Sequence, residues 1–193
     1  MTKIKICGIT NLEDAQDAID LGADFLGFNF YNKSPRYVTY QNVKDIINEL
    51  NGNVCIVGVF VNENIGNVKK ISDYCSLDLI QLSGDENNND IIQLRKKINN
   101  ANSPKYNKLG EFAGLKIDGQ KSKISKPTIF NTKIIKTIRI NNKKNKINSD
   151  LMKSFTSDYI LLDTFKDGLY GGTGESFDLN SVNGIDNKKL FLA

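Results

Sequence analysis

Short apolar runs rich in β-branched residues alternate along this chain with longer segments whose apolar residues recur at helical spacing. This alternation is typical of repeated βα units, in which helices cover a parallel sheet. The apolar runs predict strands at residues 3–7, 24–30, 54–61, 77–82, 133–140, 158–163 and 189–193. Amphipathic patterns predict helices at residues 11–22, 41–50, 64–75 and 88–98. We therefore expect an α/β fold built on a parallel sheet.

The first predicted helix has recognisable signals at both ends. Thr10 and Glu13 have the three-residue spacing of a capping box, in which a hydroxyl and a carboxylate each accept a backbone N–H. Gly22 suits the end of the helix, because glycine readily adopts the backbone shape that follows the last turn. The expected apolar face comprises Leu12, Ala15, Ala18 and Ile19.

The length of 193 residues suits one substantial core and is short for two ordinary domains, so residues 1–193 are predicted to form a single domain. Residues 99–132 interrupt the alternation, because they are rich in Lys, Asn and Ser and longer than an ordinary βα connection. We interpret this segment as a flexible surface insertion.

Charge and cysteine usage narrow the functional classes. The net charge of +4 comes from scattered lysines without a compact basic block, so no nucleic-acid surface is expected. No apolar run reaches the roughly 20 residues that cross a bilayer, so no membrane association is expected either. Three cysteines without a CxxC pair favour reduced thiols in the cytoplasm and argue against bound zinc.

The chain contains no histidine, which excludes Ser-His-Asp triads, His-ligated zinc and imidazole acid/base pairs. Cys7 ends the first predicted strand, and Asp163 ends the sixth. In a parallel barrel these carboxyl ends converge on one face, where reactive side chains are found. An acid and a base on opposite sides of such a mouth would flank a small sugar.

The ordinary protonation states of a cysteine and an aspartate do not suit a thiolate base and a carboxylic acid. A free thiol has a pKa of about 8.5 and a free aspartic acid one of about 3.9, so neutral solution favours the thiol and the carboxylate. If the thiol were the base and the carboxyl the acid, the site would have to favour the thiolate by positive charge or backbone amides. It would also have to favour the protonated carboxyl by burial or a nearby anion.

Five blocks of sequence resemble phosphoribosylanthranilate isomerase, an enzyme family of tryptophan biosynthesis. They are KICGIT at residues 5–10, GFNFYNKSPRYV at 27–38, VGVFVN at 57–62, QLSGDE at 81–86 and GGTGESFD at 171–178. The blocks keep the order of the family and span nearly the whole chain. The resemblance implies a (β/α)8 TIM barrel, of which this chain supplies about seven strands.

The resemblance also implies a reaction. It is the Amadori rearrangement of N-(5-phosphoribosyl)anthranilate to 1-(2-carboxyphenylamino)-1-deoxyribulose 5-phosphate, without a cofactor or a metal. The matching positions make Asp163 the general acid that protonates the furanose oxygen, and Cys7 the base that removes the proton from C2. The implied partner is a small phosphorylated substrate, and association as a homodimer or with another enzyme of the pathway stays open.

The same resemblance implies residues that hold the substrate. Arg36 would pair with the anthranilate carboxylate through its planar fork, which suits two parallel hydrogen bonds. The glycine-rich block would form a mobile loop that closes over the substrate, because glycine permits close backbone approach. The remaining substrate-binding candidates, with the glycines of that loop, are Gln81, Gly171, Gly172, Gly174 and Asp178.

Three departures from the family keep alternatives open. Ser83 stands where the family has a histidine, and Leu179 stands where it has a tryptophan. The sequence stops in the seventh predicted strand, so the last βα unit and its phosphate-binding loops are expected to be missing. The alternatives are a catalytically silent or partner-completed barrel fragment, or another sugar-phosphate isomerase.

Overall fold

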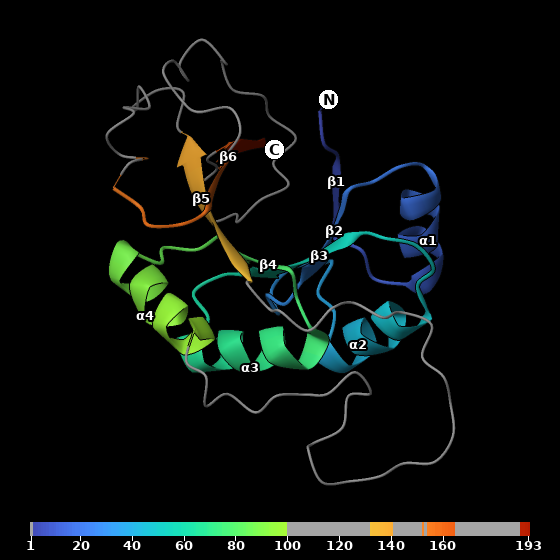
Figure 1. The fold of residues 1–193 in the computed structure, drawn as a ribbon, viewed down its shortest axis with the longest axis horizontal. Coiled ribbons are helices and arrows are strands. Elements are labelled where there is room, and N and C mark those ends of the chain that lie inside the picture. The colour runs from blue at the N-terminus through green and yellow to red at the C-terminus, as the bar shows by residue number, and fades with distance from the viewer. Residues whose placement is uncertain (1, 100–131, 141–151, 153, 165–189) are drawn as a thin grey trace, which may run out of the picture.

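A computed structural model describes residues 2–99, 132–140, 152, 154–164 and 190–193, and it contains a curved parallel sheet (Figure 1). Seven strands follow one another in chain order across this sheet, each parallel to its neighbours. The strands are β1 (Lys5–Cys7), β2 (Phe25–Asn29), β3 (Cys55–Phe60), β4 (Leu79–Leu82), β5 (Lys133–Ile140), β6 (Tyr159–Thr164) and β7 (Leu190–Leu192). All seven predicted strands are confirmed, with ends that shift by at most two residues.

Within the described residues, four helices lie along the outer side of the curve (Figure 1). They are α1 (Leu12–Asp20), α2 (Tyr40–Glu49), α3 (Ile65–Cys75) and α4 (Asn88–Asn99). The first three begin after a residue whose side-chain oxygen accepts a backbone N–H of the first turn, namely Asn11, Thr39 and Asn64. No helix in the described part of the chain is long and apolar enough to cross a membrane.

The predicted capping box of α1 is wrong. Asn11 is the N-cap, and its side-chain oxygen accepts the backbone N–H of Asp14 at 2.8 Å. The Asn11 amide returns a hydrogen bond to the Asp14 carboxylate at 2.8 Å. Asparagine is among the strongest N-cap residues, so it displaces Thr10 and starts the helix one residue later. The end is as predicted, because Gly22 follows α1 with a φ of +92°.

Apolar side chains pack on both faces of the sheet. On the outer face, strand residues such as Leu26 and Ile80 pack against the helices, including the predicted Ala15 and Ala18 of α1. On the inner face, one cluster draws only on strands: Phe25, Val57, Leu79, Ile135 and Leu161. Because side chains alternate along a strand, residues two positions from a member of this cluster also face the inside of the curve.

A repeated aspartate ties the strands together in pairs at their amino ends. Asp24, Asp78 and Asp158 each stand directly before an even-numbered strand. Each carboxylate accepts a backbone N–H from the preceding strand or its approach, at Ile4, Ile56 and Ile134, over 2.7–2.8 Å. In barrels this end supports stability, whereas the carboxyl ends carry the chemistry. These three hydrogen bonds therefore stabilise the end of the sheet opposite the predicted site.

Two predicted segments cannot be compared with the fold. The expected insertion at residues 99–132 lies almost wholly outside the described residues, which include only its first and last positions. The glycine-rich block at residues 171–178 also lies outside them. Strands β1 and β7 stand at the two ends of the order of described strands.

Candidate active site

Cys7 is the last residue of β1, and its thiol is free and exposed. The thiol faces the inside of the curve, because it lies against Gly27, two positions after Phe25 of the inner cluster. A Cβ built on Gly27 would lie 2.7 Å from the Cys7 sulfur, which is too close for any real side chain. The glycine that opens the second family-like block therefore makes room for the candidate base.

Arg36 lies beside Cys7. Its Nη1 donates a hydrogen bond to the backbone carbonyl of Cys7 at 3.1 Å. Gly8, at a φ of +89°, lets the arginine pass, since a Cβ there would lie 2.6 Å from the Arg36 Cδ. The loop that carries Arg36 is fixed by Ser34, whose hydroxyl accepts hydrogen bonds from the Arg36 backbone and the Asn29 side chain.

Asp163 lies near the carboxyl end of β6 and is half-buried. It faces the inside of the curve, because Leu161, two positions earlier, belongs to the inner cluster. Burial raises the pKa of the Asp163 carboxyl, although the Thr164 backbone N–H, the Arg139 guanidinium and the Lys5 ammonium each lower it. The net direction favours the protonated form that a general acid requires.

Cys7 and Asp163 thus share one face and one end of the sheet. Lys5, two residues before Cys7 on the same face, acts to lower the pKa of the Asp163 carboxyl, against the larger effect of burial. This arrangement supplies a thiol and a carboxylic acid to one concave surface. The chemical roles of the two residues stay predictions.

The other two cysteines are poorer candidates for the base. Cys75 is buried, and burial raises the pKa of its thiol to about 12 despite the opposing charge of Lys44. Cys55 is half-buried and packs against the inner cluster at the start of β3, the end opposite the candidate site. Position and accessibility therefore single out Cys7 among the three thiols.

Gln81 and Ser83 lie on the inner face at the end of β4, and both are buried. The Gln81 amide donates to the Ser83 hydroxyl at 2.9 Å, and that hydroxyl pairs with the Thr137 hydroxyl of β5 at 3.0 Å. The serine that replaces the histidine of the family is thus part of a short polar chain. The buried Gln81 Oε1 makes no hydrogen bond in the structure.

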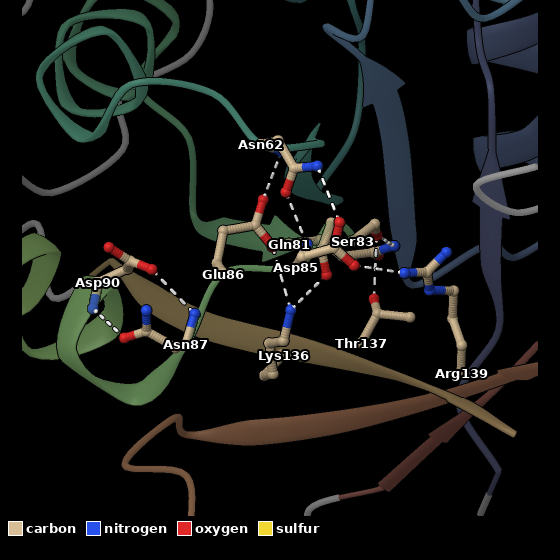
Figure 2. A network of polar contacts seen from close by, with 11 residues as sticks. Asn62, Gln81, Ser83, Asp85, Glu86, Asn87, Asp90, Lys136, Thr137 and Arg139 are labelled. Atoms are coloured by element: carbon tan, nitrogen blue, oxygen red, sulfur yellow. Dashed lines mark hydrogen bonds and ion pairs between the residues drawn. The ribbon is translucent and has the colours of Figure 1, made fainter. Parts of the chain in front are cut away.

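Sequence reasoning missed a network that joins the ends of β3, β4 and β5 (Figure 2). Lys136 is buried and donates to the Glu86 carboxylate at 3.0 Å and to the Gly84 carbonyl at 2.8 Å. The other oxygen of Glu86 accepts the Asn62 backbone N–H at 2.7 Å. The signal was a lysine inside the apolar run of β5, because a buried charge in a strand requires a partner.

Arg139 was missed as well, although it lies on β5 on the inner face. It is paired in register with Asp163 and forms an ion pair with Asp85, with 2.6 Å between Nη2 and Oδ1 (Figure 2). Its alternation with Ile135 and Thr137 was a usable signal for an inward-facing charge.

A cavity of about 540 Å³ lies beside this network and contains neither Cys7 nor Asp163. Its charged lining is mostly acidic, with Lys97 as the one cation among its lining residues. Such a lining disfavours a ligand that carries a phosphate and a carboxylate. The charged residues of the lining are Glu63, Asp85, Glu86, Asp90 and Lys97.

Comparison with known proteins places this geometry in a family. The family model of N-(5'-phosphoribosyl)anthranilate (PRA) isomerase matches residues 4–113. The isomerase of Citrifermentans bemidjiense is 35% identical over 178 residues, which cover 92% of this chain and 68% of that protein. The chain belongs to the PRA isomerase family. A Bacillus cereus PRA isomerase is 34% identical over 99% of this chain and 76% of its own length.

Solved PRA isomerases share the fold. The Thermotoga maritima enzyme superposes with a TM-score of 0.65 at 30% identity, over 94% of this chain and 70% of that chain. A PRA isomerase in complex with reduced 1-(o-carboxyphenylamino)-1-deoxyribulose 5-phosphate gives a TM-score of 0.59 at 30% identity, over 86% and 66%. The Thermotoga maritima enzyme is described as dimeric. The seven parallel strands and alternating helices are therefore the (β/α)8 TIM-barrel arrangement of PRA isomerases, curled and not closed by the described strands.

Proposed function

We propose that this chain isomerises N-(5-phosphoribosyl)anthranilate to 1-(2-carboxyphenylamino)-1-deoxyribulose 5-phosphate, the reaction of tryptophan biosynthesis for which its family is named. The observation that carries the proposal is the placement of an exposed thiol and a raised-pKa carboxyl on one concave face of a PRA isomerase scaffold. The Cys7 thiol must stay free, so the proposal includes a reducing compartment such as the cytoplasm.

In the first step, the Asp163 carboxyl gives its proton to the furanose ring oxygen. The bond from C1 to that oxygen breaks as the anthranilate nitrogen shares its lone pair with C1, which forms a Schiff base. Acid catalysis is required because the ring oxygen is otherwise a poor leaving group. Burial of Asp163 supports this role, since it keeps the proton available nearer neutral pH.

In the second step, the thiolate of Cys7 removes the proton from C2. The electron pair moves toward the iminium nitrogen and gives an enolamine, which takes a proton at C1 and tautomerises to the ketone. No atom is gained or lost overall. Gly27 supports this role, because any larger residue would fill the space of the sulfur.

We propose Arg36 as the partner of the anthranilate carboxylate. Its guanidinium lies over Gly8 and is steadied by the Cys7 carbonyl, so one residue links the substrate's acid group to the base. Gln81 is a further proposed contact near the sugar. Gly171, Gly172, Gly174 and Asp178, which lie outside the described residues, remain proposed contacts on the resemblance alone.

Turnover of the named substrate is the test. The purified chain is mixed with N-(5-phosphoribosyl)anthranilate made in situ, and the loss of anthranilate-type fluorescence is followed. We expect turnover that disappears in a Cys7→Ser/Asp163→Asn double variant of equal stability. A folded wild-type chain that leaves the fluorescence at the rate of the double variant would support a catalytically silent barrel and end the proposal.

Replacing Arg36 with lysine is expected to raise KM by roughly ten- to hundredfold and to change kcat little. The lysine keeps the charge but loses the fork, and a hydrogen bond to a charged group is worth about 1.5–3 kcal/mol. Steady-state kinetics measure the split, with Lys33→Met in the same loop as the control. A fall in kcat with an unchanged KM would instead assign Arg36 to support of Cys7.

A further inference from the structure

The Asp163 carboxyl is surrounded by a small set of charges. The Thr164 backbone N–H donates to Oδ1 at 2.8 Å, and the positive charges of Arg139 on β5 and Lys5 on β1 each act to lower the pKa of the carboxyl. The described residues of the other neighbouring strand, β7, are uncharged. Both cations favour the ionised carboxylate and so oppose the acid form.

Arg139 does not act on Asp163 alone. It is the register partner of Asp163 and shares its face, so the two Cα atoms lie on adjacent strands about 5 Å apart. The guanidinium nevertheless reaches toward β4, where Nη2 contacts the Asp85 Oδ1 at 2.6 Å (Figure 2). The Arg139 side chain is 18% exposed and the Asp85 side chain is 62% exposed. The guanidinium is therefore mostly covered, whereas the carboxylate that pairs with it lies largely in solvent.

Asp85 is held in place from two sides. Its backbone N–H donates to the Asn62 side-chain oxygen at 2.6 Å, and the Asn62 amide donates to the other Asp85 oxygen at 3.1 Å. Gly84 permits this contact, because a Cβ there would lie 2.3 Å from that Asn62 oxygen. Asn62 itself adopts a φ of +52°, a backbone shape that asparagine tolerates better than most residues. A loop this closely fitted presents Asp85 at one fixed position.

We propose that Asp85 is a positioning residue, which holds the Arg139 guanidinium at the β4 loop and so limits how strongly that positive charge acts on the Asp163 carboxyl. The inference rests on the proposed role of Asp163 as the general acid. Asp85, within the QLSGDE block at residues 81–86, would then influence the protonation of Asp163 without contacting the substrate.

The sign of the effect follows from the charges. A general acid works only while protonated, so kcat/KM falls as the pH rises through the pKa of Asp163 in the free enzyme. Without Asp85, more of the charge of Arg139 acts on Asp163, stabilises its carboxylate and moves this alkaline limb to lower pH. Without Arg139, the carboxylate loses a stabilising neighbour, and the limb moves to higher pH.

The test compares pH profiles of kcat/KM for Asp85→Asn, Arg139→Gln and the double variant. On the alkaline limb, we expect Asp85→Asn to lower kcat/KM and Arg139→Gln to raise it, each by about two- to fivefold, the scale of a partly exposed ion pair. The double variant should behave like Arg139→Gln, because Asp85 acts through the arginine. The exposed positions Asp45 on α2 and Lys70 on α3 provide charge-matched controls, Asp45→Asn and Lys70→Gln. Lys5→Met is a positive control, which should move the alkaline limb to higher pH.

A second readout separates this inference from the proposed function. Carbon-13 NMR of the Asp163 carboxyl follows its titration without catalysis and should show the same opposite shifts. If Asp163→Asn keeps the wild-type alkaline limb, the role as general acid fails, yet the NMR titration still decides whether Asp85 and Arg139 act on this carboxyl. Shifts in the same direction, an unshifted titration, or a full Asp85→Asn effect in the Arg139→Gln background would overturn the positioning role.

Discussion

Asp163→Asn is expected to lower kcat by about a hundredfold to ten-thousandfold, the usual contribution of a positioned acid. The amide has nearly the shape of the carboxylic acid, so KM should change far less than kcat. It has no proton to give to the ring oxygen at neutral pH, and opening of the furanose would then rely on water. Stopped-flow or steady-state fluorescence of the anthranilate group measures the fall in kcat directly.

The pH profile sharpens this prediction. Burial raises the pKa of Asp163, so the wild-type alkaline limb should lie above the ordinary range of a carboxyl, and the asparagine variant should lose it. Asp45→Asn, which removes an exposed carboxylate from the outer helix α2, should leave kcat within twofold. An Asp163→Asn enzyme with near-normal turnover would remove this residue from the mechanism.

Cys7→Ser is expected to lower kcat by about a hundredfold or more, because a serine hydroxyl loses its proton far less readily than a thiol. The two side chains have similar size, and the exposed position requires little repacking. The thermal midpoint should therefore stay near that of the wild type while turnover falls. Measuring both on the same preparation separates lost chemistry from lost folding.

Cys55→Ser provides the matched control for this variant. Cys55 lies at the amino end of β3, on the same inner face but at the opposite end of the scaffold from Cys7. We predict nearly unchanged turnover for Cys55→Ser. Equal losses in both variants would mean that the thiol of Cys7 has no special role.

The strands could be predicted because each is a short apolar run whose neighbours are polar helices and turns. Lys133–Ile140 was placed to the residue, since Ile134, Ile135, Ile138 and Ile140 leave little alternative to a buried strand. The cap of α1 was misjudged because two adjacent residues, Thr10 and Asn11, are both of types that cap helices. Only the geometry shows that the Asn11 oxygen reaches Asp14.

The candidate site could likewise be predicted only in part. Cys7, Arg36 and Asp163 stood out because their residue types carry chemistry at strand ends or in adjoining loops. Lys136 and Arg139 were missed because their partners, Glu86 and Asp85, lie 50 and 54 residues away in the chain. Pairings of that kind depend on strand register, which a single sequence does not display. The raised pKa of Asp163 likewise arises from burial created by the fold.

The central claim is that a thiol and a carboxylic acid flank one ribose from opposite sides. A crystal structure of this chain with reduced 1-(o-carboxyphenylamino)-1-deoxyribulose 5-phosphate tests it most directly. We predict the Cys7 sulfur within about 3.5 Å of C2, and an Asp163 carboxyl oxygen within about 3.5 Å of the former ring oxygen on the other side of the sugar. Both groups on the same side, or either one separated from the sugar by a layer of other side chains, would contradict the account.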